Sequence, residues 1–241
     1  MNFFLLFALA LAPGIAIGIY IYLKDSHERE PIHLLLLSFL YGGLSTAVTF
    51  VISYPIHLFF FTESVDALDQ FYDAFFKVAL IEEFSKFIFV RFILYPNKNF
   101  NEPFDGIVYA VMVSMGFATV ENLIYVFEQG FVTGVLRVFT AVPAHATFAV
   151  MMGYFLGKAK FSRTGSIYFS ILALLTPTFF HGTYDYFWFI SYVPGLWIGG
   201  VVSLAVGFVL SKRAIRIHHS NSPFFQKPDQ VKDEYDKSDG A

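Results

Sequence analysis

The feature that most constrains the fold of this chain is a series of long apolar runs. A helix needs about 20 apolar residues to cross a hydrocarbon core of about 30 Å, and only helices and closed barrels satisfy their backbone in lipid. The runs occupy approximately residues 2–23, 32–53, 72–95, 104–127, 135–157, 166–190 and 194–211. The sequence therefore predicts an all-α, polytopic membrane bundle of about seven transmembrane helices.

The composition agrees with a membrane protein. Hydrophobic residues make up 56% of the chain and charged residues 15%, whereas a soluble domain carries about 25% charged residues. A net charge of -3 gives no indication of a nucleic-acid partner. The absence of cysteine from the sequence excludes disulfides and thiolate metal ligands. The first apolar run lacks a basic leader and is longer than a signal-peptide core, so we expect a retained first span.

Lysine and arginine alternate between the loops that join the predicted spans. They occur in the first, third and fifth loops and at the start of the tail, and are absent from the second, fourth and sixth loops. The positive-inside rule then predicts an outside N-terminus and a cytosolic C-terminus. Residues 1–211 would form the transmembrane domain, with its site in spans at about 72–190, and residues 212–241 a polar, disordered cytosolic tail.

Most spans hold few ionisable side chains, and the exceptions that stand out lie in four of them. They are Glu82, Glu83 and Lys86 in the third span, Glu121 in the fourth, Arg137 and His145 in the fifth, and His181 and Asp185 in the sixth. A charged residue at a helix centre costs about 2.5–3.5 kcal/mol, so these residues should face the bundle interior. With the predicted topology, the carboxylates and imidazoles lie roughly 9–16 Å below the outer surface. Four helices therefore bring them to one layer.

Helical spacing relates several of these residues. Glu82 and Glu83 both lie within one turn of Lys86, but they point about 100° apart, so one can line a cavity while the other pairs with Lys86. The spacing leaves open which glutamate does which. His181 and Asp185 are four residues apart, a geometry in which a carboxylate fixes an imidazole tautomer.

Carboxylates and imidazoles in a semi-dry cavity suit the activation of water. They could act by general base catalysis or through a bound divalent metal such as zinc. The candidate catalytic residues are Glu82, Glu83, Glu121, His145 and His181, with Glu83, Glu121, His145 and His181 as candidate metal ligands and Lys86, Asn122, Arg137 and Asp185 as supporting residues. The sequence contains neither a G-x-S-x-G nor an H-E-x-x-H motif.

The ordered set of motifs resembles the PrsW-type intramembrane proteases, relatives of the CAAX prenyl endopeptidases. The elements that match are "EEFSK" from Glu82, "FDGIVYA" with Asp105, "GFATVEN" with Glu121 and Asn122, Arg137, His145, and "HGTYD" from His181. They cover residues 78–190. In CAAX endopeptidases a histidine stands where this chain has Glu121, a difference that argues against prenyl-protein processing and leaves metal dependence open.

The resemblance implies an enzyme of the bacterial cell membrane whose catalytic centre comprises the glutamate pair and the later glutamate and histidines. It implies cleavage of a membrane-anchored substrate, typically a single-span anti-sigma factor cut near the outer face as the first step of a stress response. Two other functions remain open: a proton- or cation-coupled transporter, and a catalytically silent scaffold of the same fold. Structural alternatives also remain, namely an ion pair of the glutamates with Lys86, an interhelical hydrogen bond at Asn122, and a helix-start role for Asp105.

Overall fold

The computed structural model describes residues 3–60 and 64–224, and over these residues the secondary structure is helical throughout. The helices are α1 (Phe3–Lys24), α2 (Ile32–Phe60), α3 (Ala67–Tyr72), η1 (Asp73–Ala79), α4 (Leu80–Phe89), η2 (Val90–Leu94), α5 (Pro103–Gln129), α6 (Phe131–Phe139), α7 (Ala141–Phe161), α8 (Ser166–Phe189) and α9 (Trp197–Ser220). The segments η1 and η2 are π-helical and continuous with α4. The predicted all-α class is confirmed.

Five helical stretches are long and apolar enough to cross a membrane, as judged by length and composition. They are Phe3–Lys24, Ile32–Phe59, Pro103–Gln129, Phe131–Phe161 and Trp197–Ser220. The other two predicted spans coincide with the continuous helix from α3 to η2 and with α8, both of which carry polar site residues. That these two also cross the bilayer, and which way the bundle faces, stay predictions.

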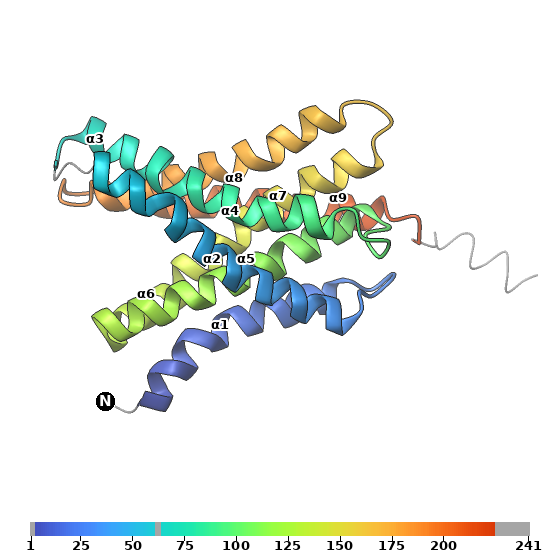
Figure 1. Ribbon diagram of the computed structural model, residues 1–241, viewed down its shortest axis with the longest axis horizontal. Helices are drawn as coiled ribbons and strands as arrows, with labels where there is room; N and C mark the ends of the chain where they lie inside the picture. The colour runs from blue at the N-terminus through green and yellow to red at the C-terminus, as the bar shows by residue number, and fades with distance from the viewer. Residues whose placement is uncertain (1–2, 61–63, 225–241) are drawn as a thin grey trace, which may run out of the picture.

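The chain runs back and forth between two ends of the molecule (Figure 1). The loops that follow α1, η2 and α7, and the end of α9, gather at one end, which we call the basic end; the loops before α3, α6 and α9 gather at the other. The fifth predicted span differs in detail, because it is broken at Thr140 into α6 and α7. Helix α9 continues to Ser220, into the segment expected as the tail, and residues 225–241 lie outside the described residues.

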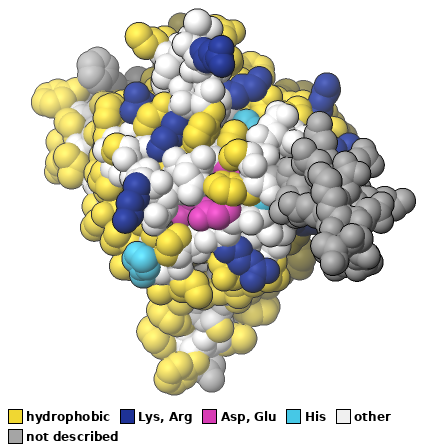
Figure 2. Space-filling model, turned by 90° about the vertical axis from the view of Figure 1, so that its right-hand side faces the viewer, with side chains coloured by type: hydrophobic (Ala, Val, Ile, Leu, Met, Phe, Trp, Pro, Cys, Tyr) yellow, Lys and Arg dark blue, Asp and Glu magenta, His cyan; other side chains and the backbone are white. Residues whose placement is uncertain are grey.

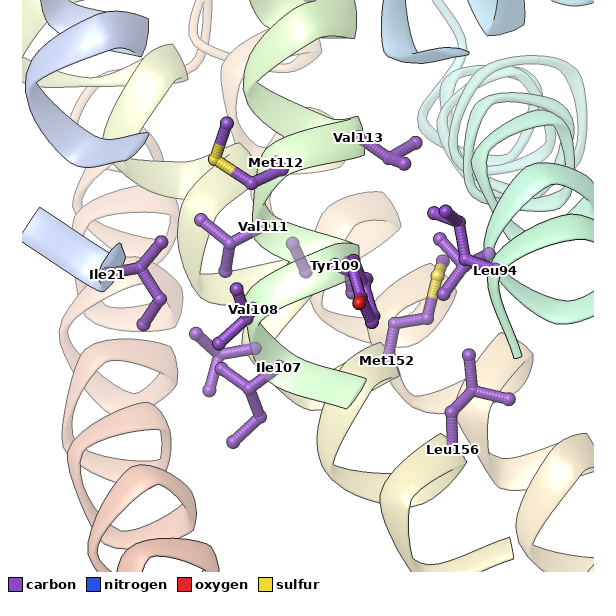
Figure 3. Close-up of a cluster of buried hydrophobic side chains, with 14 of the residues drawn as sticks. Ile21, Leu94, Ile107, Val108, Tyr109, Val111, Met112, Val113, Met152 and Leu156 are labelled. Carbon is purple, nitrogen blue, oxygen red and sulfur yellow. The ribbon is translucent and has the colours of Figure 1, made fainter. Parts of the chain in front are cut away.

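Helix α5 lies at the centre of the bundle and packs mainly against α7, α2 and α1. Figure 3 shows its apolar side chains, Ile107 to Val113, surrounded by Ile21 of α1, Leu94 of η2, and Met152 and Leu156 of α7. Most of α5 is buried, which explains why its apolar residues show no single outward face. Helices α1, α2, α8 and α9 expose apolar side chains widely, as lipid contact requires, whereas α7 is mostly buried.

Two glycine contacts let neighbouring helices approach α5 closely. A β-carbon at Gly116 would lie 1.9 Å from the carbonyl oxygen of Phe39 in α2, and one at Gly153 of α7 would lie 2.2 Å from that of Gly106. Small residues at such crossings allow backbones to pack in direct contact. They hold α2 and α7 at the distances from α5 that position the polar residues described next.

Candidate active site

The polar residues that the sequence places in one layer do meet in one network. Helix α4 contributes Glu82, Glu83 and Lys86, α5 contributes Glu121 and Asn122, α6 contributes Arg137, α7 contributes His145, and α8 contributes His181 and Asp185. Each of these residues contacts at least one other. All of the predicted catalytic and supporting residues are therefore brought together.

Glu83 is the anchoring carboxylate. Its side chain is fully buried, and its Oε1 accepts hydrogen bonds from Lys86 Nζ at 2.8 Å and from His181 Nδ1 at 2.9 Å. Lys86 is 1% exposed, lies 3.3 Å from His145 Nδ1, and sits 4.1 Å above the ring of Phe117. The ion pair expected as a structural alternative thus exists, at hydrogen-bond distance for Glu83 and at 3.6 Å for Glu82.

Glu82 occupies a different environment. Its Oε2 is buried without a hydrogen-bond partner, 3.6 Å from Lys86 Nζ and 3.9 Å from His181 Nε2. The side chain lines the cavity described below, whereas Glu83 does not. Of the two adjacent glutamates, Glu82 therefore faces the cavity and Glu83 holds Lys86 and His181.

Each histidine is held by carboxylates. Glu121 Oε2 lies 2.8 Å from His145 Nε2 and 2.7 Å from an Arg137 terminal nitrogen. Asp185 Oδ2 lies 3.1 Å from His181 Nε2, as the four-residue spacing predicted. Arg137 also donates from Nε to Asn122 Oδ1 at 2.6 Å, so it bridges α5 and α6 instead of pointing into solvent.

A cavity of about 410 Å³ opens onto these groups. Its polar lining consists mainly of Glu82, Glu121, Arg137, His145, His181 and Asp185, and its remaining wall is largely apolar and aromatic. A second cavity of about 390 Å³, between α2 and η1, shares Val78, Glu82 and Phe189 with the first. Glu82 therefore stands where the two cavities meet.

The residues present include a donor set for a divalent metal, but each imidazole would exchange one of its present contacts for the ion, because both ring nitrogens of His145 and of His181 have a partner within 3.3 Å. One ligand atom each from Glu82, His145 and His181 lies within 4.8 Å of the others, and the unpaired Glu82 oxygen needs a partner. One carboxylate and two imidazoles form a donor set used by catalytic zinc sites. Glu83 and Glu121, which the sequence also offered as ligands, instead bond to the two imidazoles, as outer-sphere carboxylates do at zinc sites.

Three neighbours of the site were not expected from the sequence. Phe148 stacks on His181 with ring centroids 4.9 Å apart, and Tyr125 lies under Arg137 at 4.1 Å. Ser114 donates a hydrogen bond to the carbonyl oxygen of His145. Helical spacing in the sequence could have predicted the first two. Phe148 lies three residues after His145, and Tyr125 lies four residues after Glu121, so each shares a helix face with a site residue.

Comparison with known proteins shows the family of the chain. The family model described as "PrsW family intramembrane metalloprotease" matches residues 30–211. A protein named Protease PrsW from Geobacillus kaustophilus is 40% identical over 76% of this chain and 79% of its own length. Its namesakes from Bacillus subtilis and Clostridioides difficile are 36% and 34% identical, over 76% and 78% of this chain and 82% and 80% of their own lengths. No solved structure matches the chain. The chain is thus a multi-pass membrane protein that belongs to the PrsW family of intramembrane metalloproteases.

Proposed function

We propose that this protease hydrolyses a peptide bond of a single-span membrane protein, with an anti-sigma factor as the substrate class, near the outer face of a bacterial plasma membrane. Family membership favours an enzyme over the transporter and scaffold alternatives. The bacterial relatives and the distribution of loop charges support the membrane and the orientation. The observation that carries the catalytic proposal is the buried Glu82 carboxylate oxygen that accepts no hydrogen bond, beside two imidazoles and at the junction of two cavities.

Glu82, His145 and His181 would hold a divalent metal such as zinc, which supplies Lewis-acid activation of water when bound. Glu83 contacts Nδ1 of His181 and so fixes the orientation of its ring. Nε2 is the nitrogen that would bind the metal, and it would exchange its present contact with Asp185 for the ion. Lys86 neutralises Glu83, so that this fully buried carboxylate stays charged at low cost.

Two cavity carboxylates lie outside that ligand set, Glu121 and Asp185, and Asp185 is held at His181. His145 and Arg137 hold Oε2 of Glu121, and this carboxylate remains in contact with the cavity. We assign to it the uptake of a proton from the attacking water, a role that general base catalysis requires of a group within reach of that water. Arg137, which also lines the cavity, offers positive charge close to where the carbonyl oxygen becomes negative.

The second cavity offers a path for the substrate. It lies between the C-terminal half of α2 and η1 and ends at Glu82. Few contacts join α2 to η1, in contrast with the close packing of α2 on α5. An extended segment entering between them would reach the site from the side of the bundle, which is the route that a membrane-anchored substrate needs.

Substitution combined with metal analysis tests these roles. In proteoliposomes with a single-span anti-sigma factor, we expect Glu82→Gln to lose both bound metal and cleavage. Glu121→Gln should keep the metal yet lose cleavage by at least about 100-fold. Glu128→Gln, at the exposed end of α5, is the matched control and should cleave normally. Normal cleavage by the Glu82 and Glu121 variants would rule out the proposed roles.

The orientation has a separate test, because the chain has no cysteine. Single cysteines at two exposed positions, Ala67→Cys near α3 and Thr164→Cys in the loop after α7, can be labelled from either side of intact cells. The proposed topology requires a membrane-impermeant thiol reagent to label Cys at 67 only. Labelling at 164 only would invert the topology and move the cleavage site to the cytosolic half.

A further inference from the structure

A second group of buried carboxylates lies at the basic end, far from the candidate active site. The loop between α1 and α2 contributes Asp25, Glu28 and Glu30, and the start of α5 contributes Glu102 and Asp105. Four of the five are 0–2% exposed, and Glu28 is half-buried. Asp105 lies sixteen residues before Glu121 in α5, about 24 Å along the helix, so this group, which we call the acidic cluster, is a separate site.

Local structure uses one oxygen of several of these carboxylates. Asp25 Oδ2 accepts from the backbone N–H of Glu30 at 3.0 Å, and Asp105 Oδ2 accepts from those of Asn101 and Glu102 at 2.7 and 2.8 Å. Glu30 Oε2 accepts from the Tyr109 hydroxyl. The helix-start role expected for Asp105 is therefore confirmed, as one half of a capping box with Glu102.

The other oxygens are left without partners. Buried carboxylate oxygens that accept no hydrogen bond are Asp25 Oδ1, Glu28 Oε2, Glu30 Oε1, Glu102 Oε2 and Asp105 Oδ1. Capping accounts for one oxygen of Asp105 but does not explain why five carboxylates turn a second oxygen into the same buried space. Unpartnered buried oxygens are costly and rare in native proteins, so their concentration here points to a ligand.

Basic side chains surround the cluster but do not neutralise it. Figure 2 shows acidic side chains at the centre of the basic end, with Lys and Arg side chains around them. Lys160 donates instead to the carbonyl oxygens of Tyr95 and Asn97, at 2.5 and 3.2 Å, and the guanidinium of Arg29 lies over the ring of Tyr22. Within residues 3–60 and 64–224, no Lys or Arg forms an ion pair with any member of the cluster.

The spacing of the oxygens suits a metal ion. Ligand atoms of Asp25, Glu102 and Asp105 lie within 4.8 Å of one another, and so do those of Glu28, Glu30 and Asp105. Because every donor is a carboxylate, the cluster favours a hard cation over zinc. We propose that the acidic cluster binds a hard divalent cation, Mg²⁺ or Ca²⁺, which ties the α1–α2 loop to the start of α5.

Such a site would be structural. It joins the loop that follows α1 to the helix that carries Glu121, and the Tyr109 hydroxyl extends the connection one turn into α5. Its ligands share no residue with the candidate catalytic metal site, so the two sites can be emptied independently. The proposal does not depend on the proposed catalytic roles.

The experiment is cation binding to the full chain in detergent micelles after metal removal. Trp fluorescence should show unfolding at least about 5 °C higher with Mg²⁺ or Ca²⁺ at about 100 times its Kd than in chelator. Tb³⁺, used as a luminescent substitute for Ca²⁺, should bind with emission sensitised by Tyr109, which is hydrogen-bonded to Glu30. Competition between the two ions against Tb³⁺ identifies which one the cluster prefers.

Asp25→Asn with Glu102→Gln should weaken Tb³⁺ binding at least about tenfold, because each charged ligand contributes strongly to a hard-cation site. Glu82→Gln and Glu128→Gln are matched controls that leave the cluster intact, and should bind Tb³⁺ as the wild type does. If the wild-type protein neither binds Tb³⁺ nor gains stability from Mg²⁺ or Ca²⁺, the proposal is wrong. This result needs no variant, so a misfolded variant cannot obscure it.

Discussion

Helix α5 passes two buried groups of carboxylates, and the two groups balance their charge differently. Around Glu121 the carboxylates meet Lys86, Arg137 and two imidazoles, at distances of 2.7–3.9 Å. Around Asp105, in the acidic cluster, five carboxylates meet no Lys or Arg ion-pair partner among the described residues. Both groups are largely buried, yet only the first supplies its own positive charge.

The difference follows from the cost of burying charge. A buried ion pair persists when both partners and their hydrogen bonds are present, whereas an isolated buried charge is expelled or neutralised. The group around Glu121 therefore supplies its own positive charge, and it leaves a carboxylate oxygen of Glu82 at the cavity available for chemistry. The acidic cluster has to obtain positive charge from outside, as protons or as a cation.

The largest effect is expected from Lys86→Met, which would make the first group resemble the second. Met keeps the length of the side chain but removes the charge that neutralises Glu83, leaving a buried carboxylate uncompensated at a cost of about 3–5 kcal/mol. We expect loss of cleavage and a large drop in thermal stability, measured by Trp fluorescence. Lys98→Met, at an exposed site, serves as the control and should change neither quantity. Wild-type stability in the Lys86 variant would show that Glu83 does not depend on Lys86.

A smaller effect is expected from Gly153→Ala, which disturbs both groups together. The new β-carbon would meet backbone atoms of Gly106 and Ile107 at 2.2 and 2.5 Å, so α7 would have to move away from α5. Overpacking of this kind costs about 1–3 kcal/mol, and we expect cleavage and cation stabilisation to fall in parallel. Gly207→Ala, whose β-carbon would have its first contact at 3.4 Å, should keep both. Loss of one property alone would show that α7 does not couple the two groups.

The sequence predicted the first group well because helical spacing and polarity in an apolar run are local signals. The contacts of Glu83 with Lys86 and of His181 with Asp185 follow from intervals of three and four residues. The choice of Glu82 as the cavity carboxylate could not be predicted, since it depends on how α4, flanked by π-helical turns, is rotated against α8. The break at Thr140 could not be predicted either, because α6 and α7 together form one uninterrupted apolar run in the sequence.

The acidic cluster was not predicted because its residues lie in two segments that are far apart in the sequence, a loop and the start of a helix. Asp25, Glu28 and Glu30 stand in a loop whose Lys24 and Arg29 served to assign topology, and Glu102 and Asp105 begin α5 more than 70 residues later. Neither segment alone indicates a site. Their meeting depends on the packing of α1 against α5, which no interval in the sequence encodes.

Asp185→Asn should have a moderate effect, confined to the first group. The amide keeps the shape of the side chain but weakens the contact with His181 Nε2, which lies 3.1 Å from Asp185 Oδ2. Loss of an outer-sphere carboxylate typically costs about 10–100-fold in metal affinity or activity. Metal titration and cleavage rates should therefore fall by that factor, while added metal restores part of the cleavage. Cation stabilisation through the acidic cluster should stay unchanged, and a change there would contradict the independence of the two sites.

The smallest effect is a pH dependence to which the second group contributes. Burial raises the pKa of Asp25 from 3.8 to about 7 and that of Glu30 from 4.5 to about 7. For Asp25, repulsion from Glu102 and Glu28 adds to the effect of burial, while the backbone N–H of Glu30 and the charge of Arg29 oppose it. For Glu30, repulsion from Glu28 and Asp25 adds to the effect of burial, while contacts with Tyr109 and Asp105 oppose it. A carboxyl group whose pKa is higher in the folded than in the unfolded protein contributes to stability. This contribution is fully present below about pH 4 and is lost as the pH rises through about 7.

Chelator-treated protein should therefore unfold at a lower temperature at about pH 8 than at about pH 5. The double variant Asp25→Asn with Glu30→Gln, which cannot gain these negative charges, should show less of this decline. Mg²⁺ or Ca²⁺ should oppose the decline, because a cation binds the deprotonated carboxylates and competes with their protons. The contrary result is an unfolding temperature that changes with pH in the same way in wild type and variant, with and without the cation. It would mean that the acidic cluster balances its charge within the protein, as the group around Glu121 does.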